Sequence, residues 1–75
     1  MGECVIPMIS RTEAERGRRA AKMNGIRATV VSVDPSVTLK GCTVGLNLPC
    51  KYADEIVILF DMKGIRHGEI IGRLR

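Results

Sequence analysis

The sequence predicts one α+β domain of the ferredoxin-like type, with the element order β-α-β-β-α-β. Three observations support this class. The 75 residues are enough for one compact domain and too few for two. Residues 23–27, MNGIR, recur with one change as residues 62–66, MKGIR. Each half of the chain also shows strand-like, helix-like and strand-like patterning in turn. We therefore expect a four-stranded antiparallel sheet with two helices on one face and the first and third strands in its centre.

The internal repeat has a shift of 39 positions, from residue 23 to residue 62, and relates residues 4–34 to residues 42–73. Both copies contain Gly-Ile, at 25–26 and 64–65, and both lead into an apolar pair, at 30–31 and 70–71. Glycine followed by a hydrophobic residue is typical of the left-handed turn that ends a helix. The repeat therefore predicts that the helix of each half ends at its Gly-Ile.

In the first half, Ser10 and Glu13 have the spacing of a capping box, which predicts a helix over residues 12–23. The residues expected to face the sheet are small, which allows close packing, and a β-branched strand is expected over residues 27–33. Pro7 conflicts with a central strand, because proline has no N–H for the ladder. We expect the first strand either to start after Pro7 or to carry a bulge there.

In the second half, apolar residues alternate over residues 42–48 and predict a half-buried strand that ends at Pro49. Residues 51–62 have the periodicity of a helix, and the repeat supports that assignment. The apolar positions that carry it are Ala53, Ile56, Val57 and Phe60. A last strand is expected over residues 66–71, with glycines 68 and 72 interrupting it.

Twelve basic and eight acidic side chains give a net charge of +4, which permits an anionic partner without identifying one. RNA binding is the least favoured function, because the only aromatic residues, Tyr52 and Phe60, fall on the second predicted helix and not on the sheet. No glycine pattern of a nucleotide-binding loop is present. The longest apolar run, residues 56–60, is far too short for a membrane span. We expect neither a cofactor nor a membrane anchor.

The three cysteines, Cys4, Cys42 and Cys50, form no C-x-x-C pair and are odd in number. This pattern predicts reduced thiols in a cytoplasmic protein and argues against a disulfide scaffold. His67 is the only histidine, so four closely spaced zinc ligands are absent and we expect no metal site. His67 itself is interpreted as a partly exposed strand residue.

In the predicted topology, the start of the first helix, Ser10 to Thr12, lies at the same end of the sheet as Lys40, Gly41 and Cys42. The helix N-terminus and the cations Arg11 and Lys40 would favour the thiolate of Cys42. The alternative is that Cys42, in phase with the apolar residues after it, is a small core residue. Cys4 and Cys50 are expected together at the opposite end. Cys50 precedes the second helix, where it is either a second activated thiol or an inert loop residue.

Residues 34–42, DPSVTLKGC, followed by a strand and a helix, resemble the small selenium/sulfur carrier-like domains of bacteria. The resemblance covers about residues 5–72. The matching positions are Ser10, Thr12, Gly25-Ile26, Pro35, Cys42 and Gly68. The chain departs from the family at three places: Thr43 replaces the glycine after the cysteine, Gly41 stands where serine is usual, and Pro7 comes early.

The resemblance implies a carrier, and not a true enzyme, that accepts a chalcogen atom on Cys42 and passes it on by exchange at that sulfur. Arg11, Lys40 and the amides after Ser10 would stabilise its thiolate, and Cys50 or Cys4 would resolve the persulfide only if brought within reach. The partners would be a sulfur or selenium donor protein and an acceptor protein. The competing prediction is a non-catalytic module, whose open sheet face, including Thr43, Gly45 and Asn47, pairs two copies of the chain or binds a regulatory ligand.

Overall fold

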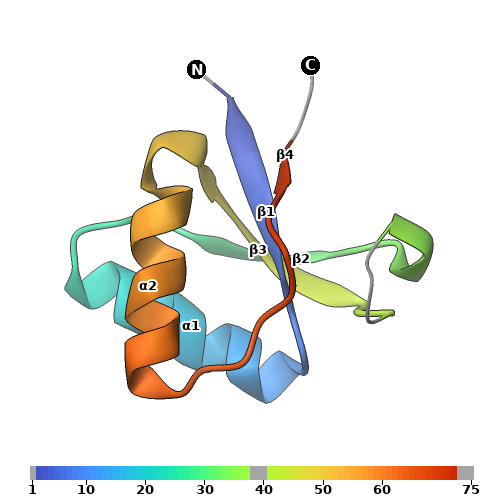
Figure 1. Ribbon diagram of the computed structural model, residues 1–75, viewed down its shortest axis with the longest axis horizontal. Coiled ribbons are helices and arrows are strands. Elements are labelled where there is room, and N and C mark those ends of the chain that lie inside the picture. The colour runs from blue at the N-terminus through green and yellow to red at the C-terminus, as the bar shows by residue number, and fades with distance from the viewer. Residues whose placement is uncertain (1, 38–40, 73–75) are drawn as a thin grey trace.

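The computed structural model describes residues 2–37 and 41–72. Its elements follow the predicted order of strands and helices (Figure 1). They are β1 (Glu3–Met8), α1 (Arg11–Met23), β2 (Thr29–Ser32), η1 (Pro35–Val37), β3 (Val44–Pro49), η2 (Cys50–Tyr52), α2 (Ala53–Lys63) and β4 (Ile71–Gly72), where η marks a single 3₁₀ turn.

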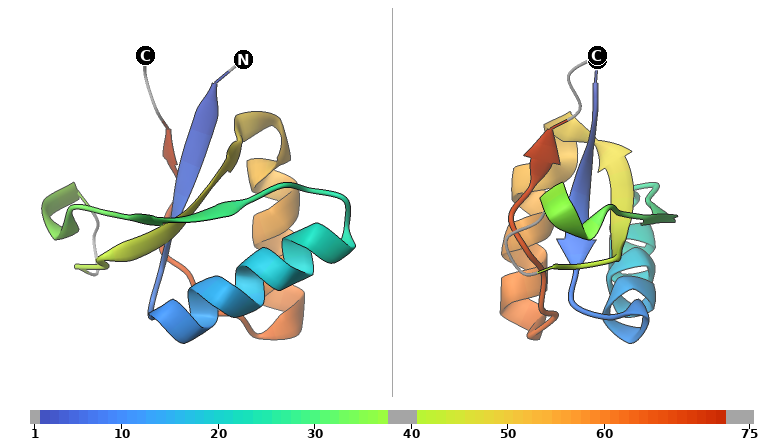
Figure 2. Two further views of the ribbon diagram at one scale, coloured as in Figure 1. Left: turned by 180° about the vertical axis from the view of Figure 1, so that it is seen from behind. Right: turned by 90° about the vertical axis from the view of Figure 1, so that its right-hand side faces the viewer.

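The four strands form one antiparallel sheet in the order β2-β3-β1-β4. The two central strands pair along their whole length, from Glu3 opposite Pro49 to Met8 opposite Val44. In the right-hand view of Figure 2 both helices lie behind the strands. The prediction of a small α+β domain with a four-stranded antiparallel sheet and two helices is confirmed.

The main core lies between the helices and the inner face of the sheet. Alternate residues of β1 and β3 are buried there against small side chains of α1 and larger ones of α2. Gly17 allows α1 to pack closely on this core, because a Cβ on it would come within 3.2 Å of side-chain atoms of Met8, Leu46 and Phe60. The buried members of this core are Ile6, Met8, Ala14, Ala20, Ala21, Ile26, Val44, Leu46, Leu48, Ile56, Phe60 and Ile65.

The opposite face of the sheet is more covered than the sequence predicted. Thr43 is exposed and Asn47 half-buried, but Gly45 is buried. A Cβ on Gly45 would lie 2.9 Å from both the carbonyl oxygen of Ile6 and a methyl group of Val33, and 3.0 Å from Val5. The centre of this face is therefore a closely packed layer and not an open platform.

The first strand runs through Pro7 without a bulge, so both expectations for this proline were wrong. The carbonyl oxygen of Pro7 accepts a hydrogen bond from the N–H of Gly68 at 2.7 Å. The nitrogen and the carbonyl of one strand residue point to the same neighbour, so the missing N–H of Pro7 faces the C-terminal segment and not β3. On that side, Val5 pairs with Ile71 and Met8 with His67. The C-terminal segment therefore contains one residue more than β1 between these two pairs. The extra residue thus lies in the C-terminal segment and not in β1. Because the pairing is irregular there, no N–H of Pro7 is needed for a hydrogen bond across the sheet.

The same irregularity shortens the last strand. We expected a strand over residues 66–71, but only Ile71–Gly72 is regular, with a separate bridge between Met8 and His67. Other bounds differ by a few residues. β2 is shorter than residues 27–33, β3 starts at Val44 and not at Cys42, and α2 begins at Ala53 after the turn η2.

Both helices end as the repeat predicted. Gly25 and Gly64 have φ angles of 75° and 71°, the left-handed region that glycine adopts without a steric cost. The following N–H groups, of Ile26 and Ile65, donate to Ala21 and Phe60 at 2.9 Å, which makes both turns Schellman motifs. Both isoleucines are buried and tie the helix ends to the core.

The expectation that all three cysteines are reduced was wrong, because Cys4 and Cys50 form a disulfide. The topology brings the start of β1 beside the end of β3, so Cys4 and Cys50 approach to 4.9 Å between their Cα atoms. This distance is within the range that a disulfide bridges. The bond closes a loop of 46 residues, and chain-entropy arguments give such a loop about 4 kcal/mol of stabilisation.

Gly45→Ala should reduce the free energy of unfolding by about 2 kcal/mol, because the added methyl group meets backbone that cannot move aside. Gly72→Ala is the matched control, since no atom lies within 4 Å of a Cβ at that strand position. Urea unfolding of the two variants measures the difference. Equal stability of both variants would contradict the close packing of the outer face.

Candidate functional site

A hollow of about 690 Å³ lies where the segment before β3 meets the segment after α2. The left-handed turn at Gly64 directs the chain from α2 back to the end of β1, where His67 bridges to Met8. Gly41, with a φ of 67°, makes the corresponding turn before β3. The cleft is lined by Ile9, Gly41, Cys42, Thr43, Asp61, Gly64, Ile65, Arg66 and His67.

Cys42 contributes to the wall of this cleft and is only 6% exposed. It lies outside the disulfide. The N–H of Val33 donates to the carbonyl oxygen of the next residue, Thr43, at 2.9 Å, which holds the approach to β3 in place. The thiol therefore combines features of both predictions, since it is buried like a core residue and borders a cleft like a site residue.

His67 is the second chemically active side chain of the cleft, and it is held on both sides. Its Nε2 lies 2.9 Å from Oδ1 of Asp61, and its Nδ1 lies 2.7 Å from the carbonyl oxygen of Gly68. Both partners are hydrogen-bond acceptors, and together they fix the orientation of the ring. The ring also packs on Phe60, with centroids 6.0 Å apart, and the side chain is 15% exposed. The cleft thus contains a thiol and an oriented imidazole–carboxylate pair.

Arg66 supplies a cation at the cleft, and Glu13 holds its segment. The Glu13 carboxylate accepts a hydrogen bond from the backbone N–H of Arg66 at 3.2 Å and lies 3.8 Å from its Nε. The Glu13 side chain is 12% exposed, whereas that of Arg66 is 72% exposed. Only one of the two hydrogen bonds of the predicted capping box is therefore formed. The N–H of Glu13 donates to Ser10 Oγ at 3.2 Å, while the Glu13 carboxylate joins α1 to the segment after α2.

The predicted site residues do not all lie together. Gly41 and Cys42 lie in the cleft. Ser10 and Arg11 line a separate hollow of about 220 Å³, which shares Ile9 and Thr43 with the cleft. Thr12 is exposed on α1 and lines neither hollow, and Lys40 lies outside the described residues. Cys50 is in the disulfide at the other end of the sheet.

His67, Asp61 and Arg66 line the cleft, although the sequence pattern did not mark them as site residues. The available signal was their position around the second Gly-Ile, because the turn there directs the following residues back to the end of the sheet that holds Cys42. The strand expected over residues 66–71 gave no indication that these residues border the cleft. The irregular pairing with β1 makes the start of that segment a cleft wall instead.

Neither aromatic residue lies in a strand. Phe60 is fully buried in α2, and Tyr52, in the turn before it, lies 5.2 Å from the Lys51 ammonium group. Within residues 2–37 and 41–72, no three His, Cys, Asp or Glu side chains are grouped to hold a metal ion. Across the same residues, no helix has the length and apolar character to cross a membrane.

No family model matches the chain, and no curated protein or solved structure matches it either.

The loop that leads toward Cys42 is held at its start by Asp34. Its Oδ1 accepts a hydrogen bond from the N–H of Ser36 at 3.0 Å. This bond, together with a weaker one from the Ser36 hydroxyl, lowers the pKa of the Asp34 carboxyl below its ordinary value. The ionised carboxylate is therefore the form that stabilises the turn η1.

Glu13→Ala should lower the free energy of unfolding by about 1–2 kcal/mol, because it leaves the Arg66 backbone N–H without its carboxylate acceptor. The matched control is Glu15→Ala, on the same helix, whose ion pair with Arg18 is solvent-exposed and should cost less than about 0.5 kcal/mol. Thermal unfolding measures both variants. A larger loss in Glu15→Ala would contradict the role assigned to Glu13.

Acid titration should loosen the turn at residues 34–36. The native pKa of Asp34 lies below its unfolded value of about 4. Its contribution to stability is therefore fully present above that value, and it is lost as the pH falls through the lower native pKa. The NMR signal of the Ser36 amide should move in that acidic range. Asp34→Asn should abolish the movement, and a movement that persists in this variant would show that another group is responsible.

Proposed function

We propose that the chain is a ferredoxin-like domain that carries sulfur or selenium on the thiol of Cys42. The observation that carries the proposal is the single cleft bordered by Cys42, the His67–Asp61 pair and the Arg66 cation. The strand order β2-β3-β1-β4, with both helices on one side, supports the ferredoxin-like part of the proposal. The resemblance of residues 34–42 to the carrier-like domains supports the role of Cys42.

In the loading step, the Cys42 thiolate attacks the outer sulfur of a persulfide donor, R–S–SH. A new S–S bond forms at Cys42, the S–S bond of the donor breaks, and its electron pair leaves on the donor thiolate, R–S⁻. Delivery repeats the exchange with an acceptor nucleophile and returns Cys42 as thiolate. No external oxidant or reductant is consumed in either step.

The cleft contributes two things to this chemistry. The guanidinium of Arg66 places a positive charge in the cleft bordered by Cys42, where it attracts an anionic sulfur reagent, and the imidazole oriented by Asp61 lines the same cleft. Burial of Cys42 limits attack to reagents that enter the cleft. The transferred atom would thereby be protected from bulk thiols until an acceptor protein docks. We place this exchange in the cytoplasm, with a donor protein and an acceptor protein as partners.

The second candidate is a non-catalytic module that pairs two copies of the chain or binds a ligand. It is favoured by one observation, the 6% exposure of Cys42 in phase with the core residues of β3. In this case the thiol is a packing group and reacts only when the domain unfolds.

Persulfide loading distinguishes the two. The folded protein is treated with a small polysulfide, and the mass of each cysteine peptide is measured. A carrier should gain one sulfur atom at Cys42, and Cys42→Ser, which keeps the size of the side chain, should gain none there. Arg66→Gln should slow loading of Cys42 severalfold in the carrier, because it removes the positive charge of the cleft, whereas the matched control Lys63→Gln should not. Absence of loading at Cys42, or alkylation of Cys42 only in urea, would reject the carrier and favour the module.

A further inference from the structure

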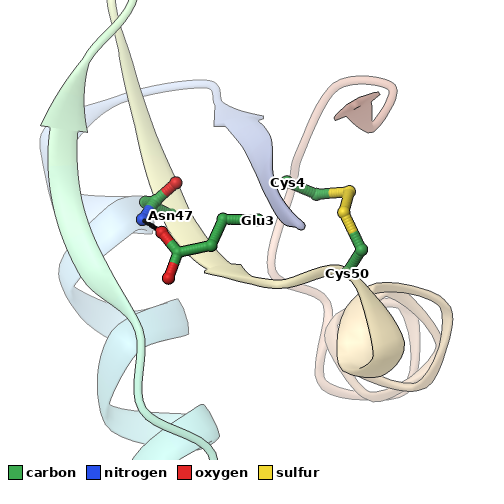
Figure 3. Close-up of a disulfide and its surroundings, with 4 residues drawn as sticks. All are labelled: Glu3, Cys4, Asn47 and Cys50. Carbon is green, nitrogen blue, oxygen red and sulfur yellow. Dashed lines mark hydrogen bonds between the residues drawn. A yellow bond between two sulfur atoms is a disulfide. The ribbon is translucent and has the colours of Figure 1, made fainter. Parts of the chain in front are cut away.

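The Cys4–Cys50 disulfide forms a sulfur site separate from that of Cys42. Cys42 precedes β3 and Cys50 follows it, so the eight intervening steps of mainly extended chain separate the two by about 26 Å. Cys50 and Cys4 are bonded to each other at the far end of the sheet (Figure 3). Neither can resolve a persulfide at Cys42 in the folded state.

The two sulfur atoms of the bond are unequally accessible. Cys4 lies in the central strand β1, between Leu48 and Gly72 of the neighbouring strands, and is 6% exposed. Cys50 is half-buried at the first position of η2. It lines a cleft of about 510 Å³ together with Gly2, Glu3, Pro49 and Lys51. An incoming thiol therefore has a route to the sulfur of Cys50 and is obstructed at Cys4.

The surroundings of Cys50 also favour a thiolate. The turn η2 continues directly into α2, and neither of their N-cap residues, Pro49 and Tyr52, provides a side-chain hydrogen bond to the first amides. The positive end of the helix dipole is thus left without a side-chain cap next to Cys50. Lys51 also lines this cleft and adds a positive charge near it, with its ammonium group 5.2 Å from the centre of the Tyr52 ring. The opposing charge is Glu3, whose carboxylate accepts a hydrogen bond from the amide of Asn47 (Figure 3).

We propose that Cys4 and Cys50 form a redox-active couple that exchanges with small dithiols, with Cys50 as the attacked sulfur and Cys4 as the leaving group. A dithiol thiolate attacks Cys50, a mixed disulfide forms, and the Cys4–Cys50 bond breaks with its electron pair on Cys4, which takes up a proton. The second thiol of the reagent then attacks its own sulfur in the mixed disulfide and releases Cys50 as thiolate. The protein disulfide is reduced by two electrons, and the dithiol becomes a cyclic disulfide.

The test uses the oxidised full chain and needs no cysteine variant. Reduction by dithiothreitol is followed by acid quenching, alkylation and mass spectrometry. Direct attack predicts a rate proportional to the dithiothreitol concentration. Exposure to the monothiol glutathione should give a mixed disulfide on Cys50 at least about tenfold more often than on Cys4. A rate that saturates with dithiothreitol, because the domain must first open, or a preference for Cys4, would overturn the proposal.

Two charge variants test the role of the cleft. Lys51→Glu should slow the attack of glutathione several-fold, because it removes a cation beside Cys50 and adds an anion. Lys63→Glu makes the same charge change at the other end of α2 and should leave the rate unchanged. Equal slowing in both variants would show that only the net charge of the chain matters. Because Cys42 is assigned separately in the same spectra, the outcome is independent of persulfide loading.

Discussion

The antiparallel ladder between β1 and β3 is the interaction on which the rest of the domain depends. It is the longest pairing in the sheet, and alternate residues of both strands build the inner core against α1 and α2. The same ladder presents the other residues to the outer face, where Gly45 allows Val5 and Val33 to approach closely. A shift of this register by one residue would exchange the two faces and remove both packed layers.

The cysteines of the molecule lie at the two opposite ends of this ladder. At one end, the segments before β3 and after α2 meet around Cys42 and His67. At the other, the start of β1 meets the end of β3, and Cys4 and Cys50 bond. Because a strand of six residues is rigid and extended, the two sulfur sites cannot exchange with each other directly.

Local signals in the sequence predicted the elements well. The capping position Ser10 and the two Gly-Ile turns depend on contacts within a few residues, so their patterns are legible without the fold. The proximity of Cys4 and Cys50 also followed from topology. Their bond was missed because the count and spacing of cysteines describe scaffolds built of several bridges, whereas this bridge depends on one register in the sheet. The cleft includes only some of the residues that the sequence marked. Gly41 and Cys42 border the cleft, but its imidazole, carboxylate and guanidinium come from a segment that pattern alone assigned to a strand.

The sequence by itself determined the order of the elements, the ends of the helices and the alternation of β3, because these follow from local backbone preferences and from periodicity. Only the tertiary structure decided which long-range groups meet. It shows that Pro7 is accommodated because its missing N–H faces an irregular partner, and that Glu13 holds Arg66 instead of completing its own cap. It also shows that His67 and Cys42 border one cleft. The contacts of Pro7 with Gly68 and of Glu13 with Arg66 join segments more than 50 residues apart in the sequence. No local pattern encodes the register between such distant segments.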